Sequence, residues 1–176
     1  MIRVTSVNSR SDVWLIYESA FPRSERRSLA QHERAMRSEP TFHCKQLMQG
    51  EKVAGVLFYW ELPSCLFVEH LAVAEPCRGN GVGTAALKWL QEQGKLLILE
   101  IEPPQDAPSR RRLAFYQAAG FVLLPYEHVQ LPFHADTPSV PMRLLSWPYA
   151  AAASEVECLE NCLRHTIMRY TDSVTN

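Results

Sequence analysis

Apolar and polar residues alternate along several short segments of this chain, which is the pattern of strands with one buried face. The alternation begins at the second residue and recurs through most of the sequence. Residues 96–99 instead form a continuous apolar run, which indicates a strand buried on both faces. The segments predicted as strands are residues 2–7, 42–48, 53–61, 65–73, 95–102, 121–124, 127–131 and 140–147.

Apolar residues at spacings of three and four predict helices between and after these strands. The first covers residues 13–21 with Ser11 and Asp12 as caps, and the second covers 24–37, whose charged side chains are interpreted as a solvated face. Residues 103–108 contain three prolines and are expected to form a loop. The remaining helices are predicted from 84 to about 94, over 109–119, and over 150–170, an amphipathic segment without glycine or proline.

Length and composition favour one α/β domain and exclude several classes of protein. A chain of 176 residues can bury a sizeable core, and a formal net charge of −1 gives no basic field for nucleic acid. The longest apolar run, residues 53–60, is too short to cross a membrane, and the first residues do not resemble a signal peptide. The five cysteines lack zinc-site spacing, so reduced thiols, no metal and a cytoplasmic location are expected.

The last helix gives the chain two predicted parts. Residues 1–148 are expected to form the domain and residues 149–176 a helical extension. The extension is expected either to pack back on the domain or to pair with another copy in a homodimer.

A glycine-rich turn follows the strand at 65–73 and leads into a helix. It contains Arg78, Gly79, Asn80, Gly81, Val82, Gly83 and Thr84. Glycines allow a tight turn and a close approach of the backbone to a ligand, and free N–H groups at a helix start favour anions. Such turns are common, so the pattern alone is weak; it lacks the lysine of a P-loop and lies too deep in the chain for a dinucleotide fingerprint.

Two motifs together resemble the GCN5-related N-acetyltransferase (GNAT) superfamily. The first is Arg78-x-x-Gly81-x-Gly83, similar to the acyl-CoA pyrophosphate loop, and the second is Phe115-Tyr116 followed by Gly120-Phe121. Residues 21–26 and 140–144 also resemble one bacterial branch of the superfamily. The sequence departs from the family at Ser109, where many members have an asparagine that contacts the cofactor.

The resemblance implies the fold and the position of a co-substrate. The fold would be a single domain with a mixed central β-sheet, whose two central strands splay apart, flanked by helices. Acetyl-CoA would bind in the gap with no metal. The residues expected to contact it are Leu71, Ala72, Val73, Arg78, Gly79, Asn80, Gly81, Val82, Gly83, Thr84 and Tyr116.

Acetyl transfer to an amine needs a base for the amine and an acid for the leaving thiolate. Tyr116 is expected to be the acid, and a backbone N–H of residues 71–73 to stabilise the charge on the carbonyl oxygen. The candidate bases are Glu69, His70, Glu100 and Glu102.

Strand alternation arranges these candidate bases. Glu69 is expected on the strand face of Leu71 and Val73, with His70, interpreted as structural, on the other face. Glu100 lies in Leu-Glu-Ile, similar to the Leu-Glu-Val of some members whose glutamate is the base. It is slightly preferred to Glu69; a structural ion pair between Glu100 and one of the arginines 110–112 stays open as the alternative.

The sequence therefore predicts an N-acetyltransferase that acts on a primary amine of a small molecule or peptide by direct attack. The alternative is a non-catalytic acyl-CoA-binding or protein-interaction module on the same fold. The acceptor is expected to meet residues 21–37 and 133–138, in which no chemical code for a particular amine is readable.

Overall fold

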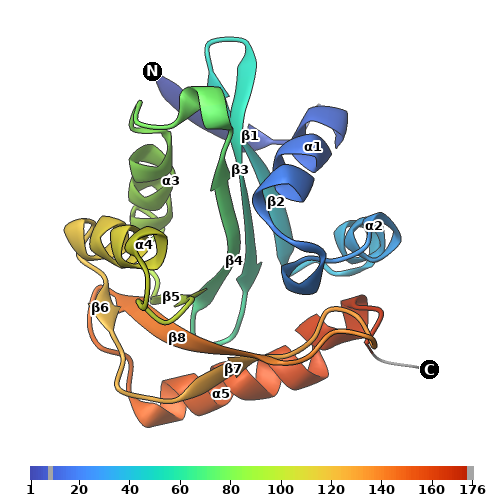
Figure 1. Cartoon of the computed structure of the whole chain (residues 1–176), viewed down its shortest axis with the longest axis vertical. Coiled ribbons are helices and arrows are strands. Elements are labelled where there is room, and N and C mark those ends of the chain that lie inside the picture. Colours follow the sequence, from blue (N-terminus) through green and yellow to red (C-terminus); the bar gives the residue numbers. More distant parts are fainter. Residues whose placement is uncertain (8–9, 174–176) are drawn as a thin grey trace.

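A sheet that curves through the molecule separates two groups of helices (Figure 1). The computed structural model describes residues 1–7 and 10–173. The strands within them are β1 Ile2–Ser6, β2 Phe42–Gln49, β3 Lys52–Glu61, β4 Leu66–Val73, β5 Leu97–Ile101, β6 Val122–Leu123, β7 His128–Gln130 and β8 Val140–Trp147. The helices are α1 Arg10–Ala20, α2 Leu29–Ser38, α3 Val82–Gln91, α4 Ala107–Ala118 and α5 Ala153–His165, with short 3-10 helices η1 Arg23–Glu25, η2 Glu75–Cys77 and η3 Ile167–Tyr170.

The strand order is β1-β2-β3-β4-β5-β8-β6, with β7 paired to β8. Neighbouring strands are antiparallel except β4 and β5, which are parallel. This mixed sheet flanked by helices confirms the predicted fold class. All eight predicted strands are present, with ends that differ from the prediction by at most two residues.

The two central strands separate after a short stretch of pairing. Leu66, Phe67 and Val68 of β4 pair with Leu97, Ile98 and Leu99 of β5, and the pairing ends there, although both strands continue. The expected splay is therefore present. It leaves the second half of β4 with one paired edge, toward β3, and one edge that faces a gap.

A β-bulge in β4 overturns the expected arrangement of side chains. Phe58 pairs with His70 but Tyr59 pairs with Val68, so Glu69 is an extra residue that reverses the alternation. Glu69 consequently lies on the same side of the sheet as His70 rather than with Leu71 and Val73. The prediction assumed an unbroken period of two, which a bulge invalidates.

Each face of the sheet has its own hydrophobic cluster. One cluster joins the sheet to α1, α2 and α5, and the other joins it to α3 and α4. Leu159 of α5 and Phe58 of β3 belong to the first, and Leu87 of α3 and Leu57 of β3 belong to the second. The C-terminal helix thus packs back on the sheet and shares its core.

The helix predicted over residues 24–37 is wrong in residues 24–28. Residues 23–25 form the separate turn η1, and α2 begins only after Ser28, whose side chain accepts a hydrogen bond from the Gln31 N–H. Arg27, expected on a solvated face, is fully buried. A charged run does not reveal that one of its members has a buried partner elsewhere.

Other helix ends also differ from their predictions, among them both ends of α3, which was predicted from 84 to about 94 and spans Val82–Gln91. The first helix begins at Arg10, so Ser11 and Asp12 lie inside it. Helix α4 begins at Ala107 and not at 109, because Asp106 caps it and Pro108 is tolerated in a first turn. Helix α5 ends at His165 and η3 follows it, so residues 150–170 are not one continuous helix. Within the described residues, no helix has the length and apolarity needed to cross a membrane.

Candidate active site

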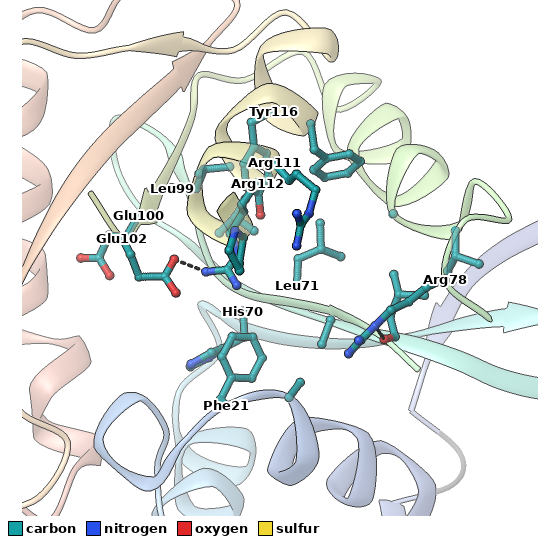
Figure 2. Close-up of a pocket in the computed structure, with 18 of the residues that line it drawn as sticks. Phe21, His70, Leu71, Arg78, Leu99, Glu100, Glu102, Arg111, Arg112 and Tyr116 are labelled. Carbon is teal, nitrogen blue, oxygen red and sulfur yellow. Dashed lines mark hydrogen bonds and ion pairs between the residues drawn. The ribbon is translucent and has the colours of Figure 1, made fainter. Parts of the chain in front are cut away.

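A cleft of about 780 Å³ opens where β4 and β5 separate, a volume suited to a small-molecule ligand. The loop after α1, strand β4, the start of α3 and helix α4 contribute to its walls. Every predicted site residue lines the cleft except Asn80, which is exposed beside it. Figure 2 shows Tyr116, Arg111 and Arg112 on one side, Phe21 and His70 on the other, and Arg78 at one end.

The edge of β4 that faces the cleft offers backbone hydrogen-bonding groups. The Ala74 N–H donates to the Ala54 carbonyl at 2.8 Å. Because antiparallel pairs alternate, Ala72 then also directs its N–H and C=O toward β3, whereas Leu71 and Val73 direct theirs toward the gap. The Val73 carbonyl accepts a hydrogen bond from Arg78 Nε at 3.3 Å, which leaves the two N–H groups as donors for a ligand.

The glycine turn leaves the start of α3 open. Gly79 and Gly81 have φ angles of +79° and +75°, a region that favours glycine. Gly81 is the N-cap residue and has no side chain to accept from the first helical N–H groups, so those of Val82 to Thr84 remain unsatisfied by the helix. Together with Arg78 they form a site for an anion.

Gly83 has a different reason to be glycine. A Cβ atom there would lie 3.1 Å from the Phe115 ring of α4. The third glycine of the motif therefore allows two helices on the same face of the sheet to pack closely.

Tyr116 directs a hydroxyl group into the cleft (Figure 2). Its ring packs against Phe115 and Phe121, and among the described residues nothing is hydrogen-bonded to the hydroxyl. Burial raises the pKa of Tyr116 to about 12, although the nearby Arg112 acts in the opposite direction. The hydroxyl is therefore protonated at neutral pH and can donate a hydrogen bond.

Glu69 forms a buried ion pair with Arg27. Both carboxylate oxygens meet the guanidinium, one of them at 2.8 Å, and the pair is buried against Phe42, Trp60 and Phe133. Burial alone would raise the pKa of Glu69, but the Arg27 charge lowers it well below its usual range. The bulge that turned Glu69 away from Leu71 is what brings it to Arg27.

Glu100 has a histidine partner instead of an arginine. His128 Nε2 lies 2.5 Å from one carboxylate oxygen, and the Gln130 amide donates to the other at 3.4 Å. Burial lowers the pKa of His128, but Glu100 and Glu160 outweigh it and raise the value. The alternative of an ion pair between Glu100 and one of the arginines 110–112 is therefore not realised among the described residues; Arg112 pairs with Glu102 instead.

Glu25 also lines the cleft; the sequence analysis placed it within the expected acceptor wall, residues 21–37, but not among the candidate bases. His70 Nε2 donates to the Glu25 carbonyl at 2.8 Å. Burial raises the pKa of the Glu25 carboxyl, and the negative charge of Glu102 raises it further. The local sign in the sequence was the resemblance of residues 21–26 to one bacterial branch of the superfamily.

Among residues 1–7 and 10–173, no group of three or more His, Cys, Asp or Glu side chains is arranged to hold a metal ion. The cleft accordingly combines backbone donors, an anion site, a tyrosine hydroxyl and carboxylates. These groups suit acid–base chemistry on a ligand with a negatively charged end.

Comparison with known proteins agrees with this chemistry. The family model described as "Acetyltransferase (GNAT) family" matches residues 10–121. A Bacillus subtilis (strain 168) protein described as "Putative acetyltransferase YjbC" is 31% identical over 103 residues, which are 57% of this chain and 52% of that protein. The chain thus spans about half the length of this curated relative.

Solved structures share the fold. A Bacteroides thetaiotaomicron protein described as an acetyltransferase of the GNAT family superposes with a TM-score of 0.86 at 24% identity, over 98% of this chain and 99% of that one. A GNAT family acetyltransferase from Elizabethkingia anophelis with acetyl-CoA bound superposes with a TM-score of 0.59 at 15% identity, over 84% of this chain and 98% of that one.

Proposed function

The chain belongs to the acetyltransferase (GNAT) family, and we propose that it transfers an acetyl group from acetyl-CoA to a primary amine of a small molecule or peptide by direct attack. The observation that carries the proposal is the Tyr116 hydroxyl, which is protonated, lacks a protein partner among the described residues and points into the cleft. The ring is buried while the hydroxyl opens to the cleft, where a bound ligand can accept its hydrogen bond.

The acetyl donor fits the half of the cleft that begins at Arg78. The N–H groups at the start of α3 and the Arg78 guanidinium suit a pyrophosphate. The free edge of β4 suits an extended arm with amide groups, which would pair with it as an added strand. The acetyl-CoA held by the Elizabethkingia anophelis protein supports the same donor for this chain.

The residues around the splay then have separate tasks. An N–H of Leu71 or Val73 donates to the thioester oxygen and stabilises the charge that develops on it. Tyr116 gives its proton to the departing sulfur. Between the two carboxylates predicted as the base, Glu100 is better suited than Glu69, because Arg27 strongly lowers the proton affinity of Glu69.

The test is release of free thiol from acetyl-CoA in the presence of a panel of amines. We expect thiol release above the amine-free background with at least one primary amine, together with a rise in melting temperature when CoA is added. Binding of acetyl-CoA without thiol release across diamines, amino acids and peptide N-termini would favour the non-catalytic module instead.

A further inference from the structure

We propose that Glu25, rather than Glu100 or Glu69, is the catalytic base that takes the proton of the acceptor amine. The inference rests on the proposed acetyl transfer and deepens it. It follows from the position of Glu25 in η1 on the cleft wall formed by the loop after α1, whose Phe21 lies opposite Tyr116 in Figure 2.

The backbone of Glu25 is held in place from two sides. Its carbonyl accepts the bond from His70, and its own N–H donates to the Pro22 carbonyl at 2.9 Å. Two residues later, the Arg27 N–H donates to the Tyr17 hydroxyl at 3.1 Å, and the Arg27 side chain is buried. The carboxylate therefore extends from an anchored turn, and catalytic groups need such fixed positions.

Among the cleft carboxylates of the described residues, Glu25 differs in having no ion pair and no hydrogen-bond donor in the protein. Glu69 is bonded to Arg27, Glu100 to His128, and Glu102 to Arg112. Within the described part of the chain, the Glu25 carboxylate has no hydrogen bond and no ion pair. Its oxygens are thus available to a substrate ammonium, whereas the other three carboxylates already share their charge with a protein cation.

Because the Glu25 side chain is partly exposed, it can release a proton to water. Glu25 is half-buried, while the side chains of Glu69 and Glu100 are 4% and 9% exposed. A base in the cleft must release its proton to water after every turnover. Glu25 can do so directly.

The charges around Glu25 increase its proton affinity. Burial and Glu102 raise the pKa of its carboxyl, while Arg112 on α4 and His70 on β4 act in the opposite direction and are outweighed. General bases work best with a pKa near the working pH, so an upward shift helps Glu25 just as the downward shift disables Glu69.

The proton balance of the reaction is complete with these groups. One proton passes from the acceptor ammonium to Glu25 and then to water. The neutral amine attacks the thioester carbonyl, forming the C–N bond, and the C–S bond breaks. The nitrogen of the tetrahedral intermediate then loses its second proton to water, and Tyr116, after giving its own proton to the sulfur, takes one back from water, so the net products are the amide, the thiol and one released proton.

The decisive experiment compares Glu25→Gln with Glu100→Gln in the full chain, using the amine that the wild type acetylates. For Glu25→Gln we expect kcat to fall by about 10²-fold or more and the acidic limb of the pH–rate profile to disappear. Glu100→Gln should lose less than about tenfold and keep that limb. Glu51→Gln in the turn between β2 and β3, paired with Arg3 and outside the cleft lining, is the matched control and should equal the wild type.

The outcomes separate the proposals. A Glu25→Gln protein with an unchanged acidic limb overturns the inference, as does loss of that limb in Glu100→Gln. Should Glu25→Gln fail to fold, Glu25→Asp keeps a carboxylate and must retain the limb at reduced kcat. Failure of the proposed function looks different, because the wild type itself would then show no turnover with any amine.

A second measurement needs no substrate. Because Glu102 raises the pKa of Glu25, Glu102→Gln should move the NMR titration midpoint of the Glu25 carboxyl to lower pH. In turnover assays with the acceptor amine, the acidic limb of the rate profile should move in the same direction. A midpoint that stays in place would contradict the electrostatic part of the inference.

Discussion

Arg27 shows how far a single side chain can depart from its local sequence. It stands among charged residues, yet it is fully buried, pairs with Glu69, and donates to the Tyr170 carbonyl at 2.9 Å. Removing either partner would leave an unpaired buried charge, which is strongly destabilising. The pair therefore ties the segment before α2 to β4 and to the C-terminal turn η3, and so supports the wall that carries Glu25.

Tyr116→Phe removes only the hydroxyl group and keeps the ring packing. If Tyr116 protonates the departing sulfur, we expect kcat to fall by roughly ten- to a thousandfold, as for loss of one acid or one transition-state donor. The melting temperature and the affinity for CoA should stay near the wild type, because the hydroxyl has no partner among the described residues.

Steady-state kinetics and thermal unfolding measure the two effects separately. An unchanged kcat would exclude the acid role, provided that chemistry and not product release limits the rate. A matched control is Tyr126→Phe. The Tyr126 hydroxyl donates to the Ala151 carbonyl at 3.5 Å and lies outside the cleft lining.

Local motifs predicted some of these residues and could not predict others. Short continuous motifs contain Arg78, Gly81, Gly83 and Tyr116. The sequence alone therefore predicted that these residues line the cleft. The roles of Glu25 and Glu69 depend on partners 40 or more residues away, at His70 and Arg27. A bulge also changed the face of Glu69, and strand alternation carries no sign of it.

At the scale of elements, β4 combines three features that create the site. Its pairing with β5 ends after Val68, its bulge lies at Glu69, and its last residues lead directly into the glycine turn. The splay opens a gap and the bulge keeps Leu71 and Val73 on the α3 side of the sheet. The unpaired edge is therefore close to the open start of α3.

The glycine turn gives a prediction about CoA binding. Gly81→Val places a β-branched residue at a φ of +75°, which costs about 1–3 kcal/mol of strain and alters the turn. We expect the CoA-dependent rise in melting temperature to vanish in a protein that still folds. For the wild type, that rise corresponds to about 2.7 kcal/mol at a CoA concentration of one hundred times Kd.

Gly50→Val is the control for strain alone. Gly50 has a φ of +62° in the turn between β2 and β3, and like Gly81 it has open space where a Cβ would stand. Its variant should lose comparable stability and keep the full CoA effect. A folded Gly81→Val protein with an undiminished CoA effect would exclude the turn as the pyrophosphate site.

The strands were easier to predict than the helix ends, for a physical reason. A strand shows its residue types along its whole length: β8 carries apolar residues that are buried on both faces of the sheet at Leu144 and Leu145, and its predicted bounds equal the observed ones. A helix end depends on capping by one side chain. Asp106 caps α4 and Ser28 caps α2. Other polar residues nearby could also have served as caps, so the sequence predicted the wrong first residue for both helices.

For the whole molecule, the position of the C-terminal segment matters most. The boundary at residue 148 stays a prediction, but α5 and η3 contribute to the hydrophobic cluster that also contains Phe58 and Trp60 of β3. Figure 1 shows α5 running along β7 and β8. Glu160 of α5 faces His128, which in turn holds Glu100 at the cleft. The segment is thus connected both to the core and to the site.

Leu159→Ala tests whether this packing supports the fold. Leu159 is fully buried in the cluster, so the variant should lower the free energy of unfolding by about 2–5 kcal/mol, measured by denaturant titration. Glu157→Ala, on the exposed side of the same helix, should change it by less than about 0.5 kcal/mol. Equal stability of the two variants would mean that α5 is an appended element. A large difference, with a single unfolding transition, would mean that residues 1–148 do not form an independent domain, because the sheet needs α5 to cover one of its faces.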